Sequence, residues 1–125
     1  MKSSNSREGK LSEILAELKA EYRSSFPRKL QKLRDTRDTG DLELLREEFH
    51  KLKGTGKTYG FPEVSVVCEI MEFACQDRRA DLQTVEKAIV LLDRMQKFWV
   101  HDAHFDLDGD ADAREILNLR RGPKT

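Results

Sequence analysis

The stretch LELLREEFHKLKGTGKTY, residues 42–59, decides the fold that the sequence predicts. Its apolar residues recur at spacings of three, four and three, in the order Leu42, Leu45, Phe49 and Leu52. These residues lie on one side of an α-helix, because the helix has about 3.6 residues per turn. The stretch therefore predicts a helix from about Leu42 to Tyr59 that buries one face only.

The same helical spacing recurs on both sides of this stretch, and no segment alternates with a period of two. Short connections between amphipathic helices favour antiparallel neighbours. The sequence therefore predicts an all-α protein, an up-down antiparallel four-helix bundle with an extra N-terminal helical segment and a peripheral C-terminal tail. The apolar positions of the other segments are Leu11, Ile14, Leu15, Leu18 and Tyr22; Leu30 and Leu33; Val64, Val67, Cys68, Met71, Ala74 and Cys75; and Leu82, Val85, Ile89, Leu92 and Trp99.

Breaks between the helices follow from residues that end or begin helices. Ser25 and Pro27 interrupt the first apolar pattern, so Pro27 is expected to open or kink a second segment. Gly40 suits a helix C-terminus and Asp41 can cap the next helix. Asp81 is expected to cap the last long helix, and the helix before it should run to about Arg78.

Three parts of the chain differ in composition. Residues 1–9 are polar and without periodicity, which predicts a flexible N-terminal tail. Residues 10–104 carry the helical pattern and form one domain. Residues 105–125 are expected to be an acidic linker with a short C-terminal helix or tail.

Charge and cysteine usage limit the possible partners. Lys plus Arg and Asp plus Glu both total 23 in 125 residues, which argues against nucleic acid or a membrane as partner. Cys68 and Cys75 are seven residues apart in a helical pattern, about 10 Å, which is too far for a disulfide. Free thiols, no secretory leader and no long apolar run predict a cytoplasmic protein.

Two groups of residues raise the possibility of a bound metal. After Asp106, Asp108 and Asp110, a calcium loop would need glycine and later glutamate where Ala111 and Leu117 stand, so a solvated acidic linker is favoured. His101 and His104 share a helix spacing but lack a third ligand nearby. No resident metal is expected.

Two glycines in the 42–59 helix suggest a purpose beyond folding. Gly54 and Gly56 each cost about 1 kcal/mol relative to alanine in a helix interior. They could allow close helix packing, or the helix could end at Gly54. Side chains lean toward the helix N-terminus, however, so glycine four residues after His50 leaves the imidazole of His50 uncovered.

Cations surround this histidine along the same face. Arg46, His50, Lys53 and Lys57 follow at spacings of four, three and four, while Phe49 faces inward. The pattern fits an ordinary solvated face, but it also meets the needs of a phosphorylatable histidine. The ring nitrogen must reach a phosphorus atom in line, and the product needs nearby cations. Lys53, one turn away, is best placed to provide one.

The run His50-Lys51-Leu52-Lys53-Gly54-Thr55-Gly56, with Gly60 ten positions after the histidine, resembles the histidine phosphotransfer (HPt) signature. Tyr59-Gly60-Phe61 and Cys68-Glu69-Ile70-Met71-Glu72 are similar to the phosphotransfer domains of chemotaxis-type histidine kinases. The resemblance spans about residues 11–102. Gly56 departs from it, because serine or alanine is common at that position.

The resemblance implies a four-helix bundle that relays phosphate and has no ATP site of its own. His50 would accept phosphoryl from a receiver-domain aspartate or a histidine kinase and pass it to a response-regulator receiver. The expected partners are receiver domains of response regulators and hybrid histidine kinases. The resemblance implies no cofactor, with magnesium only on the partner, and a monomeric state.

The resemblance also assigns roles around the histidine. Glu72 would bond the Nδ1 hydrogen of His50, or would merely be exposed. Lys53 and Gly54 complete the catalytic group, and Arg46, Lys57 and Gly56 would bind phosphate or partner. The alternatives are an HPt-like docking module that binds receivers without phosphotransfer, and a purely structural bundle, which would bury the ring of His50.

Overall fold

The computed structural model describes residues 2–99 and 105–121 and is helical throughout these ranges apart from short connections. Its elements are α1 (Lys2–Thr39), α2 (Leu42–Thr58), α3 (Pro62–Gln76), α4 (Leu82–Trp99), α5 (Ala111–Asn118) and a 3-10 turn (Leu119–Arg121). The described residues contain no strand, so the predicted all-α class is confirmed.

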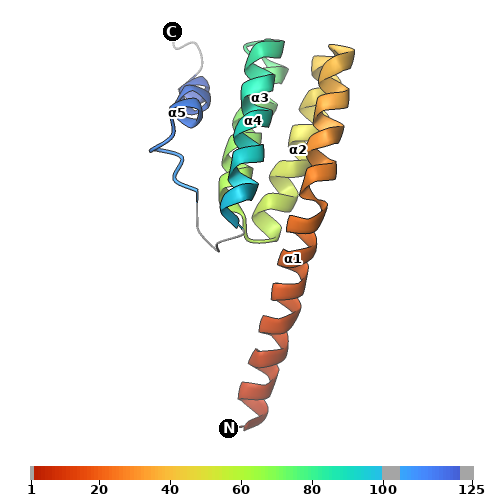
Figure 1. Ribbon diagram of the computed structural model, residues 1–125, viewed down its shortest axis with the longest axis vertical. Coiled ribbons are helices and arrows are strands. Elements are labelled where there is room, and N and C mark those ends of the chain that lie inside the picture. The colour runs from red at the N-terminus through yellow and green to blue at the C-terminus, as the bar shows by residue number, and fades with distance from the viewer. Residues whose placement is uncertain (1, 100–104, 122–125) are drawn as a thin grey trace.

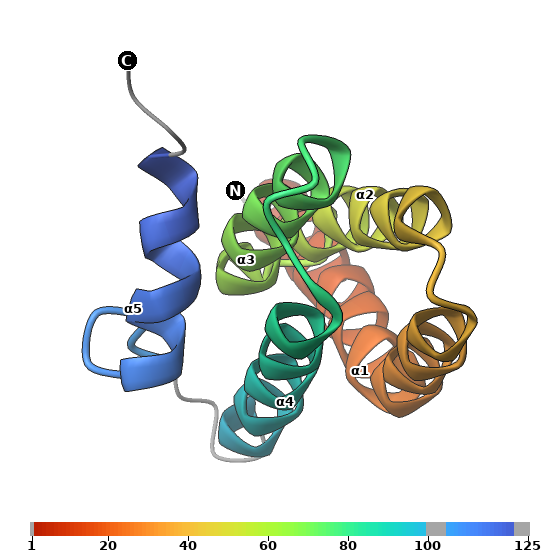
Figure 2. The same ribbon diagram turned by 90° about the horizontal axis from the view of Figure 1, so that it is seen from above.

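The first four helices form the bundle (Figure 1). Helix α2 packs most extensively against α3 and α1 against α4, while contacts between α1 and α2 and between α3 and α4 close the bundle (Figure 2). Connections of two to five residues join these helices, which forces successive helices to run antiparallel. The predicted up-down helical bundle is therefore present.

Within the bundle, the buried face of each helix matches the apolar spacing of the sequence. The most completely buried large side chains include Phe26, Leu30 and Leu33 on α1, Leu45 and Phe49 on α2, Met71 on α3, and Ile89, Leu91, Leu92 and Met95 on α4. Leu82 is an exception, since it lies in the first turn of α4 and remains exposed. Burying this many large apolar side chains is the main force that holds the bundle together.

Helix termini are capped by the residues that the sequence indicates. Gly40 adopts a φ of 73°, which suits glycine, directly after α1. The Asp41 carboxylate accepts hydrogen bonds from the backbone N–H groups of Glu43 and Leu44 at 3.0 and 3.2 Å. Asp81 caps α4 in the same way, accepting from the Thr84 N–H at 2.8 Å. These caps set where α2 and α4 begin.

The first helix differs from the prediction, because α1 is one continuous element from Lys2 to Thr39 with Pro27 inside it. The alternative in which Pro27 opens a separate helix is therefore wrong. Phe26 and Leu30 on either side of Pro27 are fully buried, so packing on the bundle holds the helix across the proline. The predicted tail, residues 1–9, is likewise helical from Lys2 onward.

The N-terminal part of α1 projects beyond the bundle (Figure 1). Leu11, Ile14 and Leu15, which the apolar spacing assigns to one face, are 58%, 52% and 55% exposed. Among residues 8–39 of α1, Tyr22 is the first that the bundle buries. The periodicity of this segment is thus helical, but its apolar face has no partner among the described residues.

The C-terminal segment is more than the peripheral tail that the sequence predicts. Phe105, Ala113 and Ile116 join the hydrophobic core, and α5 packs on α3 and α4. Asp110 caps α5 by accepting from the Ala113 N–H, and its carboxylate also accepts from Arg94 of α4 at 2.7 Å. The acidic residues therefore attach α5 to the bundle instead of forming only a solvated linker. None of the helices in the described ranges is long and apolar enough to cross a membrane.

Candidate functional site

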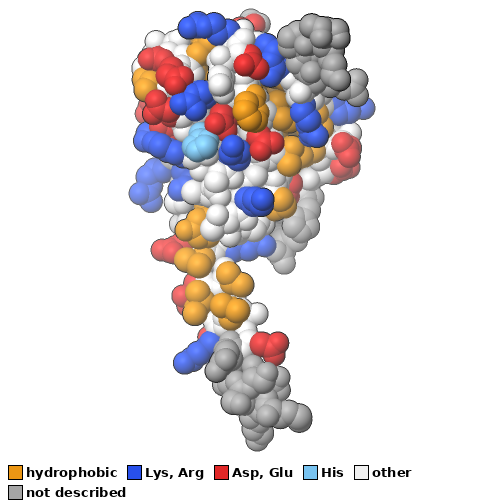
Figure 3. Space-filling view, turned by 180° about the vertical axis from the view of Figure 1, so that it is seen from behind, with side chains coloured by type: hydrophobic (Ala, Val, Ile, Leu, Met, Phe, Trp, Pro, Cys, Tyr) orange, Lys and Arg blue, Asp and Glu red, His pale blue; other side chains and the backbone are white. Residues whose placement is uncertain are grey.

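His50 lies on α2 with its side chain 59% exposed. Phe49 and Leu52, on either side of it in the sequence, are buried and fix the rotation of α2. This rotation directs the imidazole outward, and Figure 3 shows the histidine at the surface of the bundle among basic and acidic side chains. A purely structural role would bury the ring, and the structure does not do so.

Glu72 on α3 faces His50 across the α2–α3 contact. Its side chain is only 8% exposed, and its Oε2 lies 2.8 Å from Nδ1 of His50. Burial raises the pKa of this carboxyl, but hydrogen bonds from Lys53 and His50 outweigh burial, so the pKa lies below its ordinary value. An ionised carboxylate only accepts, so Nδ1 carries the hydrogen, and in the neutral ring Nε2 keeps its lone pair.

Two further cations surround the same carboxylate. The Lys53 Nζ lies 2.9 Å from Oε1 of Glu72, and the Arg46 Nη1 lies 3.7 Å from Oε2. Arg46 is itself held by Glu43, whose two carboxylate oxygens accept from Nε at 3.0 Å each. The side chains of Lys53 and Arg46 are about a quarter exposed, so both cations stand at the surface beside the ring.

The two glycines of α2 have different surroundings. A Cβ on Gly54 would meet nothing within 4 Å, so this position leaves open space beside His50. A Cβ on Gly56 would lie 3.0 Å from Ser65 Oγ and from Val64 Cβ. Gly56 is buried where α2 and α3 approach closely. The prediction that Gly56 binds phosphate or partner is therefore wrong, and the packing alternative is correct for this glycine.

A shallow groove of about 400 Å³ runs beside the histidine face. Lys53, Gly54 and Lys57 line it from α2, while Pro62 and Val66 are among the residues that line it from α3. The Ser65 hydroxyl donates to the Lys53 carbonyl at 2.6 Å and ties the two walls together. The predicted site residues Lys53, Gly54 and Lys57 thus share one surface.

Phe73 is a residue that reasoning from the sequence missed. It is 48% exposed, and the Lys53 Nζ lies 5.9 Å from the centre of its ring. Phe73 stands directly after Glu72 and outside the apolar stripe of α3. An aromatic residue off the buried stripe was the available signal, since such residues mark contact surfaces.

The remaining metal candidates do not form a site within the described ranges. No group of three or more His, Cys, Asp or Glu side chains there could hold a metal ion. His101 and His104 lie outside the described residues. Cys68 and Cys75 are buried free thiols, and burial raises the pKa of Cys75 to about 11. Thiols in this state are poor nucleophiles and poor metal ligands.

A helical bundle that exposes a histidine, bonds its Nδ1 to a buried carboxylate and leaves open space beside it has the features of a phosphoacceptor domain. The family model for the Hpt domain matches residues 17–99, two thirds of the chain. The chain belongs to the histidine phosphotransfer domain family. No curated protein and no solved structure matches it. Family membership carries a histidine phosphotransfer role in phosphorelay and interaction with receiver domains of two-component systems.

Proposed function

We propose that this chain accepts a phosphoryl group on Nε2 of His50 and passes it to the aspartate of a response-regulator receiver. The donor is an aspartyl phosphate of a receiver domain, as in a hybrid kinase, or a histidine kinase. The observation that carries the proposal is the 2.8 Å contact between Nδ1 and the Glu72 carboxylate on a ring that is otherwise open. This contact leaves Nε2 as the exposed nucleophile.

The transfer step balances with the groups present. The Nε2 lone pair forms a bond to phosphorus while the bond from phosphorus to the aspartyl oxygen breaks and releases the donor carboxylate. Nδ1 keeps its proton, so the ring gains a positive charge, which the adjacent Glu72 carboxylate offsets. In the second transfer the same bond changes run in reverse on the acceptor, with the imidazole as leaving group.

Lys53 stabilises the phosphoryl oxygens in this proposal. Its Nζ forms an ion pair with Oε1 of Glu72 at 2.9 Å, and its side chain is partly exposed beside the ring. A phosphoryl group on Nε2 carries more negative charge than a carboxylate, so the ammonium group of Lys53 can turn toward it. Arg46 and Lys57 attract the phosphoryl oxygens more weakly and from a longer distance. We propose that magnesium is supplied by the receiver and not by this chain.

The receiver would dock over the groove and Phe73. Gly54 gives the approaching aspartate access to the ring, because no side chain stands there. Pro62, Val66 and Phe73 provide apolar surface around the histidine, and Lys53 and Lys57 border it. An apolar centre bordered by charge is the usual composition of a specific protein interface.

Transfer from a phosphorylated receiver domain, or from a receiver-containing kinase, tests the proposal. Wild type, His50→Gln and a matched control, Lys51→Gln, are compared. Lys51 is exposed and pairs with Glu48, so its loss should leave transfer intact. We expect acid-labile, base-stable label on wild type and Lys51→Gln and none on His50→Gln. Receiver binding by the folded wild-type chain without any label would instead identify a docking module.

A further inference from the structure

The projecting part of α1 is an addition to the family domain, since the family match begins only at residue 17. Over its exposed turns, Leu11, Ile14, Leu15 and Leu18 form one apolar stripe, which Figure 3 shows as a hydrophobic patch below the bundle. A single exposed leucine needs no explanation, but three exposed apolar side chains and the half-buried Leu18 at helical spacing on one face do. We propose that this stripe pairs with the same stripe of a second copy of the chain, with the two helices antiparallel.

Charge on the two sides of the stripe favours a second copy over an unrelated helix. Lys10 and Glu17 are seven residues apart, about two turns, so they lie on the same side of the stripe. Glu8 and Lys19 are eleven apart, about three turns, and lie on the other side. Each side therefore carries one acid and one base, one near each end of the stripe.

These charges are symmetric about a single point. Lys10 and Glu17 are equally distant from the midpoint between Glu13 and Ile14, and so are Glu8 and Lys19. Antiparallel pairing about this midpoint puts Lys10 of each copy opposite Glu17 of the other, and Glu8 opposite Lys19. A two-fold contact requires such self-complementarity, because every pair of residues across the interface occurs twice, once from each copy. Parallel pairing would instead bring Lys10 of one copy near Glu8 of the other, and Glu17 near Lys19, so reversing both Lys10 and Glu17 distinguishes the two arrangements.

Apolar residues fit the same midpoint. Leu11 and Leu15 lie 2.5 and 1.5 residues from it, so Leu11 of each copy comes within one residue, about 1.5 Å along the axis, of Leu15 of the other. Leu18 of each copy comes within two residues, about 3 Å along the axis, of Leu11 of the other. No ion pair among the described residues occupies Glu8, Lys10 or Glu17, and these side chains are exposed. Lys19 lies with its Nζ 5.2 Å from the centre of the Phe61 ring.

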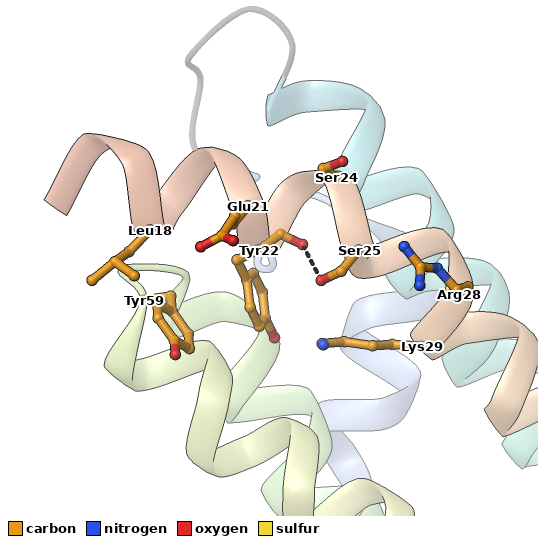
Figure 4. A pocket seen from close by; sticks show the side chains of 8 residues that line it. All are labelled: Leu18, Glu21, Tyr22, Ser24, Ser25, Arg28, Lys29 and Tyr59. Carbon is orange, nitrogen blue, oxygen red and sulfur yellow. Dashed lines mark hydrogen bonds between the residues drawn. The ribbon is translucent and has the colours of Figure 1, made fainter. Parts of the chain in front are cut away.

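The stripe continues into a pocket on the bundle. Leu18, Tyr22 and Tyr59 line this pocket of about 370 Å³ with Lys29 at its far side (Figure 4). In the antiparallel arrangement the first turns of the second copy's α1 run toward the pocket. The contact between residues 8 and 19 is about 18 Å long, which is short for a stable interface. We therefore expect a reversible dimer and not a permanent one.

Sedimentation equilibrium of the full chain, from low micromolar to near millimolar concentration, tests the pairing. We expect wild type to dimerise and Leu15→Glu to remain monomeric over the whole range. Leu15 lies outside the hydrophobic core, so the variant should keep the helical circular dichroism of wild type. Ala20→Glu is the matched control, because Ala20 is exposed on the opposite face of the same helix. It should dimerise as wild type does.

Charge reversal tests the antiparallel register. Lys10→Glu changes two attractive pairs per dimer into repulsive ones and should weaken dimerisation about tenfold. Glu17→Lys should do the same, and the double variant Lys10→Glu/Glu17→Lys should recover the affinity of wild type. A monomeric wild type at all concentrations, or a double variant no stronger than the single ones, would overturn the proposal. Neither result bears on phosphotransfer by His50.

Discussion

Glu72 holds three partners on one buried carboxylate: His50 at 2.8 Å, Lys53 at 2.9 Å and Arg46 at 3.7 Å. A buried carboxylate without partners would favour its protonated form. Here the hydrogen bonds from Lys53 and His50 lower the pKa despite the burial, so the group is ionised at neutral pH. The single negative charge of Glu72 thus orients the ring of His50. It also keeps two cations beside this ring before the phosphoryl group is transferred.

Replacing Glu72 tests this positioning role. In Glu72→Ala we expect the neutral ring to shift toward the tautomer with hydrogen on Nε2, because nothing then holds the hydrogen on Nδ1. Phosphotransfer should slow about ten- to a hundredfold, the usual effect of removing such an orienting partner. Nitrogen-15 shifts of the ring report the tautomer. Gln76→Ala, an exposed position at the end of the same helix, is the control, and an unchanged tautomer in Glu72→Ala would contradict the role.

Replacing each of the two glycines of α2 with alanine should have opposite effects on the stability of the protein. Gly54→Ala should raise the free energy of unfolding by up to about 1 kcal/mol through helix propensity, because the added methyl meets open space. Gly56→Ala should lower it by about 1 kcal/mol, since strain against Val64 exceeds that gain. Urea unfolding measures both.

Phosphotransfer separates the roles of the same two variants. Gly54→Ala should transfer more slowly although it is more stable, because the methyl stands beside the approaching phosphorus. Gly56→Ala should transfer normally at temperatures where it remains folded. Normal transfer by Gly54→Ala would show that the space beside His50 is not needed.

At this scale the sequence predicted His50, Lys53, Gly54 and the contact with Glu72 from spacing and resemblance. It misassigned Gly56, because the one-letter pattern cannot distinguish a glycine that clears space for a partner from one that admits a neighbouring helix. Only the position of Val64 on α3 decides between them. Phe73 was missed for a related reason, since exposure depends on how α3 is rotated.

At the scale of the elements, α1 shows where local rules fail. Pro27 lacks an N–H and crowds the preceding turn, which is why the sequence predicts a break there. The flanking Phe26 and Leu30 are fully buried, and their packing favours the continuous helix by more than the proline costs. The caps Asp41 and Asp81 were predictable, in contrast, because a cap depends on residues within three positions.

Pro27→Ala should therefore stabilise the protein. Proline in a helix interior costs about 3 kcal/mol relative to alanine, less about 1 kcal/mol for the stiffer unfolded chain. Pro27 is exposed, so little packing is lost, and we expect the free energy of unfolding to rise by about 1–2 kcal/mol. Pro62→Ala, at the first turn of α3 where proline is tolerated, should change it little. A less stable Pro27→Ala would mean that the proline shapes α1.

At the scale of the whole molecule, the four-helix bundle was predictable from the sequence. The arrangement of two further parts, the projecting N-terminal turns of α1 and the helix α5, was not. Four apolar stripes with short connections define the bundle, because each stripe must be covered by the others. The stripe on residues 11–18 shows the same periodicity, and only the structure reveals that α1 has by then left the bundle. At the other end, the acidic run around Asp110 suggested a linker, whereas Arg94 on α4 pairs with it and brings α5 onto the core.

A substitution in helix α5 should affect stability without affecting phosphotransfer. Helix α5 packs on α3 and α4, away from α2 (Figure 2), and Ile116 is its largest fully buried side chain. Ile116→Ala should lower the free energy of unfolding by about 2–4 kcal/mol, the cost of a cavity at a buried isoleucine. Glu72 lies on the side of α3 that faces α2, so transfer by the folded variant should match wild type. Arg114→Ala, exposed on α5, is the control. Slower transfer by a folded Ile116→Ala would mean that α5 acts on the histidine through α3, and the C-terminal segment would then belong to the phosphotransfer machinery.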